Sequence, residues 1–104
     1  MKDYLAEIKN ERDRQINAEG WSENHDDSHI NNELALAAAC YASTKPIYIA
    51  QYNKLSNMTR YSEAWPWDEE WDKRDKHSRE RQLIIAAALI IAELERLDRL
   101  NNNL

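Results

Sequence analysis

Hydrophobic and polar positions follow a helical rhythm in the first part of the chain. One face over residues 3–18 is formed by side chains at steps of three or four residues: Leu5, Ile8, Arg12 and either Gln15 or Ile16. This spacing is typical of a helix that buries one side, and Gly20 is a common type of residue to follow a helix end. Because the face begins apolar and finishes polar, a buried Arg12 needs an anionic or carbonyl partner.

Two later segments are richer in apolar residues. The segment from Glu33 to Ala42 reads ELALAAACYA, and its small side chains let a neighbouring helix approach closely. The segment from Arg79 to Leu100 contains the apolar block LIIAAALIIA, residues 83–92, and then becomes charged. A helix that is apolar all round is buried on every side. This block therefore predicts either the central helix of a bundle or half of a subunit interface.

The segments between these helices carry weaker patterns. Residues 21–32 show no apolar periodicity and predict a loop in which Asp27 or Ser28 caps the next helix. A short helix is expected from about 46 to 54, and the chain from there to Lys76 is rich in tryptophan and charge. One glycine and two prolines are too few breakers to separate many strands.

These patterns predict an all-α protein, a compact three- to four-helix bundle with a Trp-rich loop. Residues 1–100 are expected to form a single helical domain, and residues 101–104 a disordered tail. A domain of 104 residues buries a limited fraction of its surface. Association with further copies would bury more, so we expect a homo-oligomer.

Composition and charge exclude several classes of protein. The formal net charge of −5 argues against the broad basic surface by which proteins hold polymeric DNA or RNA. The single cysteine, Cys40, allows no internal disulfide, and the N-terminus has no apolar signal segment. The longest apolar run is about half of the roughly 20 residues that a membrane span needs. We expect a cytoplasmic protein that binds neither polymeric nucleic acid nor a membrane.

The segment HDDSH, residues 25–29, places two imidazoles and two carboxylates close together, and Glu33 lies one helical turn further on. Imidazole with carboxylate suits zinc, manganese or iron, although a complete metal site needs ligands from a second segment. In a structural interpretation, these side chains cap the next helix and bond to the backbone or to each other. In a third, the aspartates accept from ribose hydroxyls or an exocyclic amine, and a histidine meets a phosphate.

Four tryptophans are many for this length, and three of them lie in WPWDEEW, residues 65–71. Indole offers a large flat face and one donor, so tryptophan in a polar loop can stack on a nucleobase. The alternative is that these rings close the ends of a small bundle. A basic stretch follows directly, and together with Arg12 on a buried face its Arg79 and Arg81 are candidates for a phosphate clamp.

Signs of catalysis are few. The chain has no GxSxG motif, and Cys40 lies among alanines with no base nearby in the sequence. A single glycine excludes a glycine-rich phosphate loop. No catalytic residue, bound metal or cofactor is therefore assigned, and a non-enzymatic function is favoured.

Four strings along the chain carry a resemblance: ERDRQINAEGWSENHDDSH, ELALAAACYA, WPWDEEW and AELERLDRL. Together they resemble a group of small proteins of temperate phages and prophages over nearly the whole chain. A weaker similarity is to the ryanodine-receptor repeat domain, carried in order by Arg14, Gly20, Trp21, Asp26, Asp27 and His29. The first resemblance implies a protein that acts on defences in the cytoplasm of the bacterial host, and the second implies a nucleotide-type ligand.

The leading hypothesis is a phage anti-defence protein that binds and sequesters a small nucleotide-derived immune signalling molecule without turning it over. Tryptophans would enclose the base, arginines would meet phosphate, and histidines and aspartates would orient sugar or base edges. The candidate ligand-binding residues are Arg12, Gln15, Trp21, His25, Asp26, Asp27, His29, Trp65, Trp67, Arg79 and Arg81. Two alternatives stay open: a metal-dependent nucleotide hydrolase that uses residues 25–29 with Glu33, and a protein inhibitor of a host defence component.

Overall fold

A computed structural model describes residues 1–102 of the chain. Its elements in order are α1 (Tyr4–Asn17), α2 (Glu23–Asp27), α3 (Glu33–Ala42), β1 (Tyr48–Asn53), β2 (Met58–Glu63), the 3-10 turns η1 (Glu69–Trp71) and η2 (Arg74–Lys76), and α4 (Arg79–Asn102). The helices predicted over residues 3–18, 33–42 and 79–100 are confirmed, and each agrees within two residues at its ends. The two strands were not predicted.

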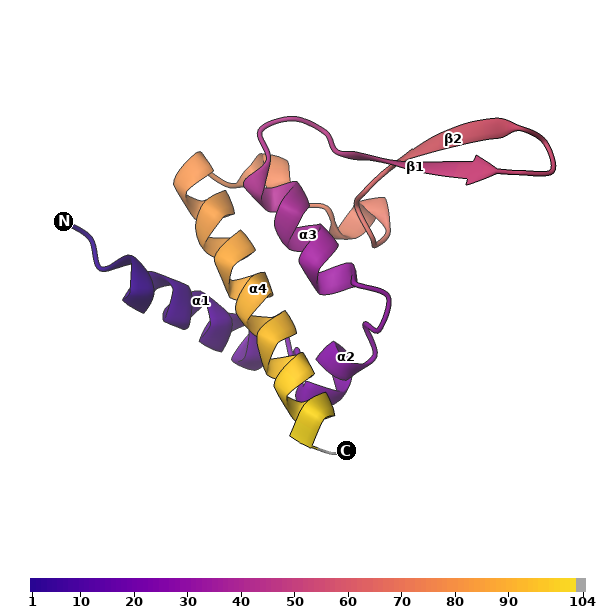
Figure 1. The fold of residues 1–104 in the computed structure, drawn as a ribbon. Coiled ribbons are helices and arrows are strands. Elements are labelled where there is room, and N and C mark those ends of the chain that lie inside the picture. Colours follow the sequence, from indigo (N-terminus) through magenta and orange to yellow (C-terminus); the bar gives the residue numbers. More distant parts are fainter. Residues whose placement is uncertain (103–104) are drawn as a thin grey trace.

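The hydrophobic core lies where α3 packs against α4 (Figure 1). Leu34 and Leu89 are the largest apolar side chains that are fully buried there. Alanines of both helices let the two backbones approach closely: Ala37, Ala38, Ala86, Ala88 and Ala92. The small side chains of ELALAAACYA therefore allow the close approach of a neighbouring helix that the sequence predicted.

The apolar block of α4 is buried on one side only. Ile85 and Leu89 are 5% and 1% exposed, whereas Leu83 and Ile90 are 46% and 50% exposed. The side with Ile85 and Leu89 belongs to the bundle core, the first of the two interpretations. The side with Leu83 and Ile90 is exposed in the single chain, and exposed leucines continue it as far as Leu97.

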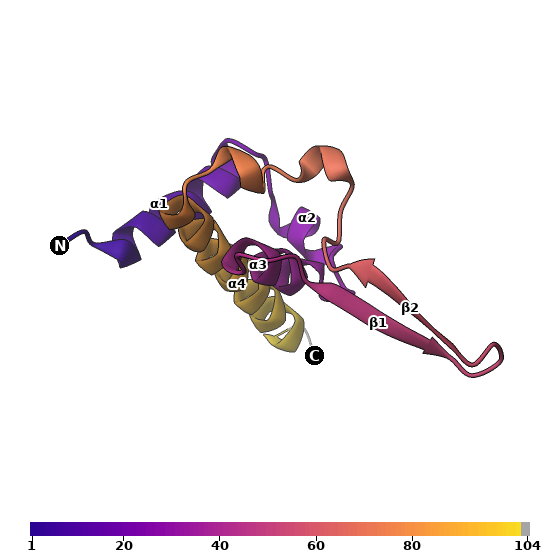
Figure 2. The ribbon, with the colours of Figure 1, turned by 90° about the horizontal axis from the view of Figure 1, so that it is seen from above.

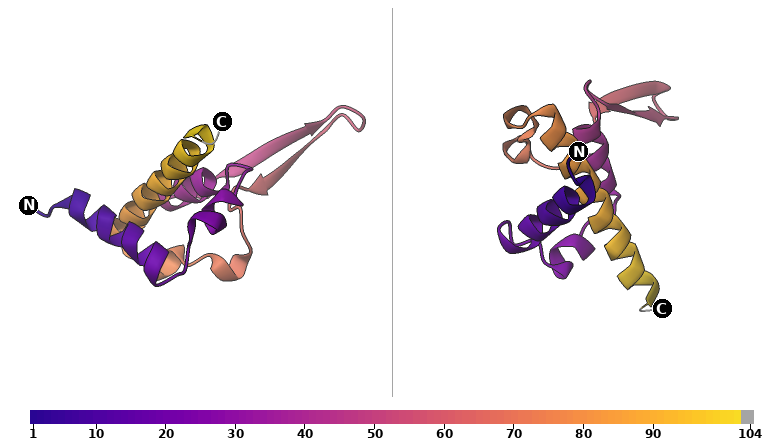
Figure 3. Two further views of the ribbon diagram at one scale, coloured as in Figure 1. Left: turned by 90° about the horizontal axis from the view of Figure 1, so that it is seen from below. Right: turned by 90° about the vertical axis from the view of Figure 1, so that its left-hand side faces the viewer.

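The buried face of α1 is polar. Glu11, Arg12 and Gln15 are at most 7% exposed where α1 crosses α4. Leu5, at the start of the predicted apolar face, is 82% exposed, because the first turns of α1 extend beyond the other helices (Figures 1 and 3). The expected burial of Leu5 is therefore wrong, while the burial of Arg12 and Gln15 is confirmed.

The predicted all-α fold is wrong, because residues 48–63 contain an antiparallel β-hairpin that makes the fold mixed α and β. Its register pairs Tyr48 with Glu63 and Ala50 with Tyr61. The helix expected from about 46 to 54 is replaced by β1. The strand sequence YIAQYN contains two tyrosines and one isoleucine, residue types that favour β-strands. A hairpin therefore forms here although the chain has few glycines and prolines.

Asparagines close the turn of the hairpin. The Oδ1 atom of Asn53 accepts the N–H of Leu55 at 2.9 Å, and Asn57 has a φ of 55°, a left-handed conformation that asparagine tolerates. The hairpin projects away from the helices (Figures 1 and 2), and every strand residue except Ile49 is exposed. The radius of gyration is accordingly 15.6 Å, against about 13 Å for a compact chain of this length.

The loop predicted before α3 contains a short helix, α2. Ser22 begins this helix, because its Oγ atom accepts a backbone N–H of the first turn at 3.2 Å. The predicted caps of α3, Asp27 and Ser28, lie instead at the end of α2. Asn32 precedes α3 with a φ of 68° and makes no side-chain cap. The capping prediction is therefore wrong.

The last helix extends further than predicted. Residues 101 and 102, the first half of the predicted tail, belong to α4, and residues 103–104 lie outside the described part of the chain. Across residues 1–102, no helix has both the length and the apolar character that crossing a membrane requires.

Ile85→Glu tests the one-sided burial of α4. The variant places an unpaired charge between α3 and α4 and is expected to lower the free energy of unfolding by about 3–5 kcal/mol. Ile90→Glu makes the same change on the exposed side and is expected to cost about 0.5 kcal/mol. Urea denaturation followed by circular dichroism measures both, and equal losses would contradict the burial described above.

Candidate ligand-binding cleft

A cleft of about 930 Å³ lies between α1, the α2 region, the segment after β2, and α4. Its lining combines aromatic, charged and apolar side chains: Glu11, Arg14, Gln15, Glu19, Trp21, His25, His29, Tyr41, Trp65, Pro66, Trp67, Asp68, Trp71, Lys73, His77, Arg81, Ile85 and Leu89. Sites for small molecules usually measure about 300–1,000 Å³. The volume therefore suits a molecule of nucleotide size.

Gly20 turns the chain back toward α1 and so positions Trp21. Its φ of 71° is readily adopted by glycine, and the N–H of Trp21 then donates to the carbonyl of Gln15 at 3.0 Å. The indole lies flat against His25, with ring centroids 5.2 Å apart and planes 13° from parallel. This stacking fixes the first face of the cleft.

This pair begins a row of six rings, here called the aromatic wall: Trp21, His25, His29, Trp67, Trp65 and Tyr41. Each ring contacts the next in this order, with ring centroids 4.8–5.9 Å apart. Most of these contacts are edge-to-face or tilted, which is the preferred geometry of aromatic pairs. The guanidinium of Arg74 lies 5.1 Å from the ring centre of Trp65 and covers it from outside. The aromatic wall is thus packed on itself before any ligand enters.

Three buried polar atoms in the lining have no hydrogen-bond partner: Gln15 Nε2, His29 Nε2 and Trp67 Nε1. The other polar atoms of two of these side chains are bonded. Gln15 Oε1 accepts from Arg12 at 3.3 Å, and His29 Nδ1 lies 3.1 Å from Glu33 Oε2. The three atoms are themselves buried from solvent, so a ligand in the cleft would reach them only if these side chains reorient.

A charged group borders the aromatic wall. Glu11 is 1% exposed and accepts two hydrogen bonds from Arg14, at 2.6 and 3.1 Å, and another from Arg81. The bond to Glu11 raises the pKa of Arg14. The hydrogen bond from Arg14 lowers the pKa of Glu19. The two arginines are thus held in place, and Lys73 adds a further cation to the lining.

A buried ion pair supports the aromatic wall through His25. Arg12 Nη2 donates to Asp26 Oδ2 at 2.6 Å, and the two residues are 7% and 0% exposed. Arg12 Nε reaches Glu95 of α4 at 2.8 Å, and Asp26 Oδ1 lies 2.9 Å from Nδ1 of His25. The prediction that a buried Arg12 needs an anionic partner is confirmed. The pair joins α1, α2 and α4 and orients the imidazole.

Seven of the predicted ligand-binding residues line the cleft: Gln15, Trp21, His25, His29, Trp65, Trp67 and Arg81. The other four do not, and their polar atoms bond within the protein. Arg12 and Asp26 bond to each other, Asp27 accepts from Arg99 at 2.8 Å, and Arg79 donates to the carbonyls of Tyr41 and Ala42. These four residues therefore lie outside this cleft, because each completes a contact between different parts of the fold.

Several lining residues were not singled out from the sequence. Glu11 lies four residues before Gln15, so it shares the same helix face, and this spacing could have identified it. Trp71 stood in the tryptophan-rich segment and is 59% exposed at the cleft. Lys73 begins the basic stretch that the sequence offered for a phosphate clamp, and only the path of the chain after β2 brings it and His77 to this cleft.

The histidine and aspartate segment does not form a metal site. Within residues 1–102, no group of three or more histidine, cysteine, aspartate and glutamate side chains is placed to hold a metal ion. Asp26 is turned toward Arg12, and Asp27 toward Arg99. The carboxylates of the segment thus diverge, and the hydrolase hypothesis has no ligand set in this geometry.

No protein-family model, curated protein or solved structure matches this chain. Function is therefore inferred from the chemistry of the cleft.

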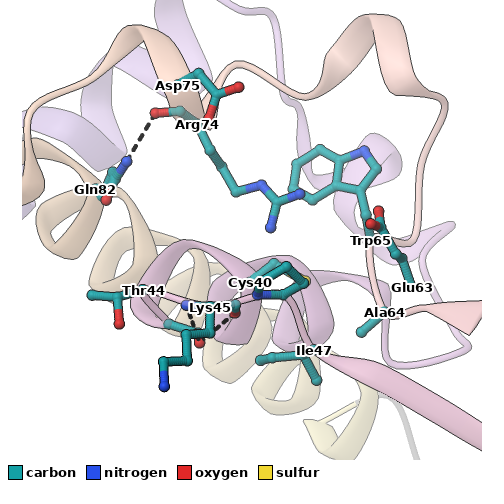
Figure 4. A pocket seen from close by; sticks show the side chains of 12 residues that line it. Cys40, Thr44, Lys45, Ile47, Glu63, Ala64, Trp65, Arg74, Asp75 and Gln82 are labelled. Carbon is teal, nitrogen blue, oxygen red and sulfur yellow. Dashed lines mark hydrogen bonds between the residues drawn. The ribbon is translucent and has the colours of Figure 1, made fainter.

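A smaller hollow of about 220 Å³ lies at the base of the hairpin (Figure 4). The side chain of Arg74 reaches toward Trp65 in this hollow (Figure 4). Two hydrogen bonds to Asp72, at 2.6 and 2.8 Å, hold Arg74 and lower the pKa of Asp72. Cys40 is 3% exposed, and burial raises the pKa of its thiol. No buried polar side-chain atom that lines this hollow lacks a partner within the described residues. The larger cleft is therefore the better ligand site.

Two neighbouring aspartates allow a matched test of the buried ion pair. Asp26→Ala leaves Arg12 charged and largely buried, and we expect a loss of about 3–5 kcal/mol in the free energy of unfolding. Asp27→Ala breaks an exposed pair with Arg99 and is expected to cost no more than about 1 kcal/mol. Chemical denaturation of both variants gives the comparison. A small loss for Asp26→Ala would show that the pair does not hold α1 to α2.

Proposed function

We propose that this protein binds a small, planar, nucleotide-derived molecule in the cleft and holds it without chemical change. The observation that carries this proposal is one cleft of about 930 Å³ whose lining joins tryptophan, histidine and tyrosine rings to cationic side chains. A flat heterocycle would lie against the aromatic wall. The edge of such a ring would reach Gln15 Nε2, His29 Nε2 or Trp67 Nε1 once these buried side chains reorient.

Three cations in the lining could meet a phosphate, in competition with the carboxylates Glu11, Glu19 and Asp68 of the same lining. Arg14, Arg81 and Lys73 line the same cleft as the tryptophans. Guanidinium groups suit phosphate because they donate hydrogen bonds in pairs. A molecule with a flat ring at the aromatic wall and an anionic group at the arginines would use both parts of the lining. Trp71, which is 59% exposed, can cover such a ligand from the solvent side.

The lining favours binding over turnover. No serine, threonine or cysteine is among the described residues that line the cleft. Glu11, its most deeply buried carboxylate, is neutralised by two arginines. His25 and His29 have neighbouring carboxylates, and no metal ligand set lies beside them within residues 1–102. Either histidine could still activate a water molecule, so recovery of the intact ligand is the observation that separates binding from hydrolysis.

A ligand that is held and not consumed is withdrawn from solution. On this basis, we propose that the protein acts in the cytoplasm of a bacterial host as a phage-encoded homo-oligomer that sequesters a nucleotide-derived immune signal. The resemblance of the chain to temperate-phage proteins supports this setting. Inhibition of a host protein would need a docking surface, and the cleft is the more specific feature.

Binding is tested with wild-type protein and a panel of cyclic dinucleotides and ADP-ribose isomers. A true ligand at 100 times its dissociation constant should add about 2.7 kcal/mol to the free energy of unfolding, which a thermal shift detects. Chromatography of the released ligand should recover it intact. If no member of the panel shifts the melting temperature, the proposed ligand class is incorrect, and conversion of the ligand would point to an enzyme.

Gln15→Glu tests whether Gln15 contacts the ligand, and circular dichroism first checks that the variant, which adds a charge at a buried position, still folds. The variant keeps the oxygen that accepts from Arg12 but replaces the unpartnered Nε2 donor with an anionic oxygen. We expect at least about tenfold weaker binding of an anionic ligand, measured by titration calorimetry. Asn10→Asp adds the same charge on an exposed position of α1 outside the cleft and should bind as the wild type does. Equal affinity of Gln15→Glu and wild type would show that Gln15 does not contact the ligand.

A further inference from the structure

The outer edge of β1 is open. At the base of the hairpin, the N–H of Ala64 donates to the carbonyl of Ile47 at 2.8 Å. In an antiparallel ladder, bonded pairs alternate with pairs whose backbone groups point away from the partner strand. Applied to the register, this places the backbone N–H and C=O groups of Tyr48, Ala50 and Tyr52 on the side away from β2. Among the described residues, none of these groups bonds to another element.

This edge lacks the features that normally prevent strand pairing. Natural edge strands carry charges, prolines or bulges that keep other strands away. β1 reads YIAQYN, which is uncharged, and its register with β2 has no bulge. β2, in contrast, carries Arg60 and Glu63. The hairpin also stands clear of the helices over most of its length (Figure 2), so β1 is accessible to another strand.

We propose that β1 pairs with β1 of a second copy of this chain, antiparallel and with Ala50 on the two-fold axis. The outward-facing residues are symmetric about Ala50, with one tyrosine two positions before it and one two positions after it. In this register, Tyr48 lies opposite Tyr52 of the second copy, and Ala50 lies opposite its own counterpart. Each outward-facing residue exchanges both backbone hydrogen bonds with its partner.

The side chains favour this register, in addition to the backbone hydrogen bonds. Tyr48 and Tyr52 lie on one face of the hairpin with Tyr61, the cross-strand partner of Ala50. All three are exposed in the single chain, at 58%, 61% and 71%. Opposed aromatic residues stabilise paired strands, and like charges would destabilise them. The proposed contact places aromatic rings opposite each other and brings no like charges together.

Pairing of two β1 strands would also stabilise a hairpin that otherwise projects into solvent with only two strands. An isolated two-stranded hairpin is marginally stable in water, whereas a sheet of three or more strands gains independent stability. Joining two hairpins through β1 makes a four-stranded sheet with the charged β2 strands at its outer edges. Those outer edges resist further addition, so assembly stops at the dimer.

The proposal is tested by sedimentation equilibrium across the micromolar to millimolar range. Wild type is expected to dimerise. Ala50→Lys and Ala50→Asp each place like charges opposite one another at the axis, and each should dimerise at least about tenfold more weakly. An equimolar mixture of the two should form a heterodimer, because opposite charges then meet. Thr59→Lys places the same charge on the outer edge of β2 and should stay dimeric.

Each other outcome would overturn the proposal. A wild type that remains monomeric shows that the edge does not pair. A dimer that survives Ala50→Lys but is lost in Ile90→Glu places the interface on the exposed side of α4. A mixture of Ala50→Lys and Ala50→Asp that fails to form heterodimers excludes the register about Ala50. Circular dichroism of every variant checks that the helices are retained.

Discussion

The arrangement of this protein depends on the buried ion pair between Arg12 and Asp26. It holds together the end of α1, the short α2 and, through Glu95, the middle of α4. An ion pair that is buried in this way is seldom worth more than an apolar contact of the same size, but either partner is costly once the other is absent. The pair therefore fixes one geometry. From that geometry follow the orientation of His25 and the stacking of Trp21 upon it.

The cleft lies where the packing of the chain is incomplete. The core between α3 and α4 is filled by alanine and leucine, while the neighbouring volume is bounded by rings, arginines and three polar atoms without partners. Native proteins satisfy the great majority of their buried polar groups, and three of the four exceptions among the described residues belong to side chains of the cleft lining. A small domain has little stability to spare. The basis of the proposed function is the combination of flat rings and cations in one cleft.

The sequence was most informative where a local pattern determines the structure. Helical periodicity located three of the helices, and the change from apolar to polar residues identified the buried Arg12. Aromatic and histidine content identified most of the cleft lining. The hairpin was missed because only the β-preference of its residues indicates it, and few glycines or prolines mark its ends. A search for helical periodicity does not detect such a segment. The roles of Asp26, Asp27 and Arg79 could not be predicted, since their partners lie distant in the chain and only the fold brings them together.

The four tryptophans carry one more consequence. Trp21, Trp65, Trp67 and Trp71 all line the same cleft, and the chain has no others. Excitation at wavelengths that tyrosine does not absorb therefore gives emission only from indoles in the walls of this cleft. This emission will report the filling, opening and collapse of the cleft without any added label. Trp21, Trp65 and Trp67 also pack against the core between α3 and α4, so loss of that core reaches the same signal.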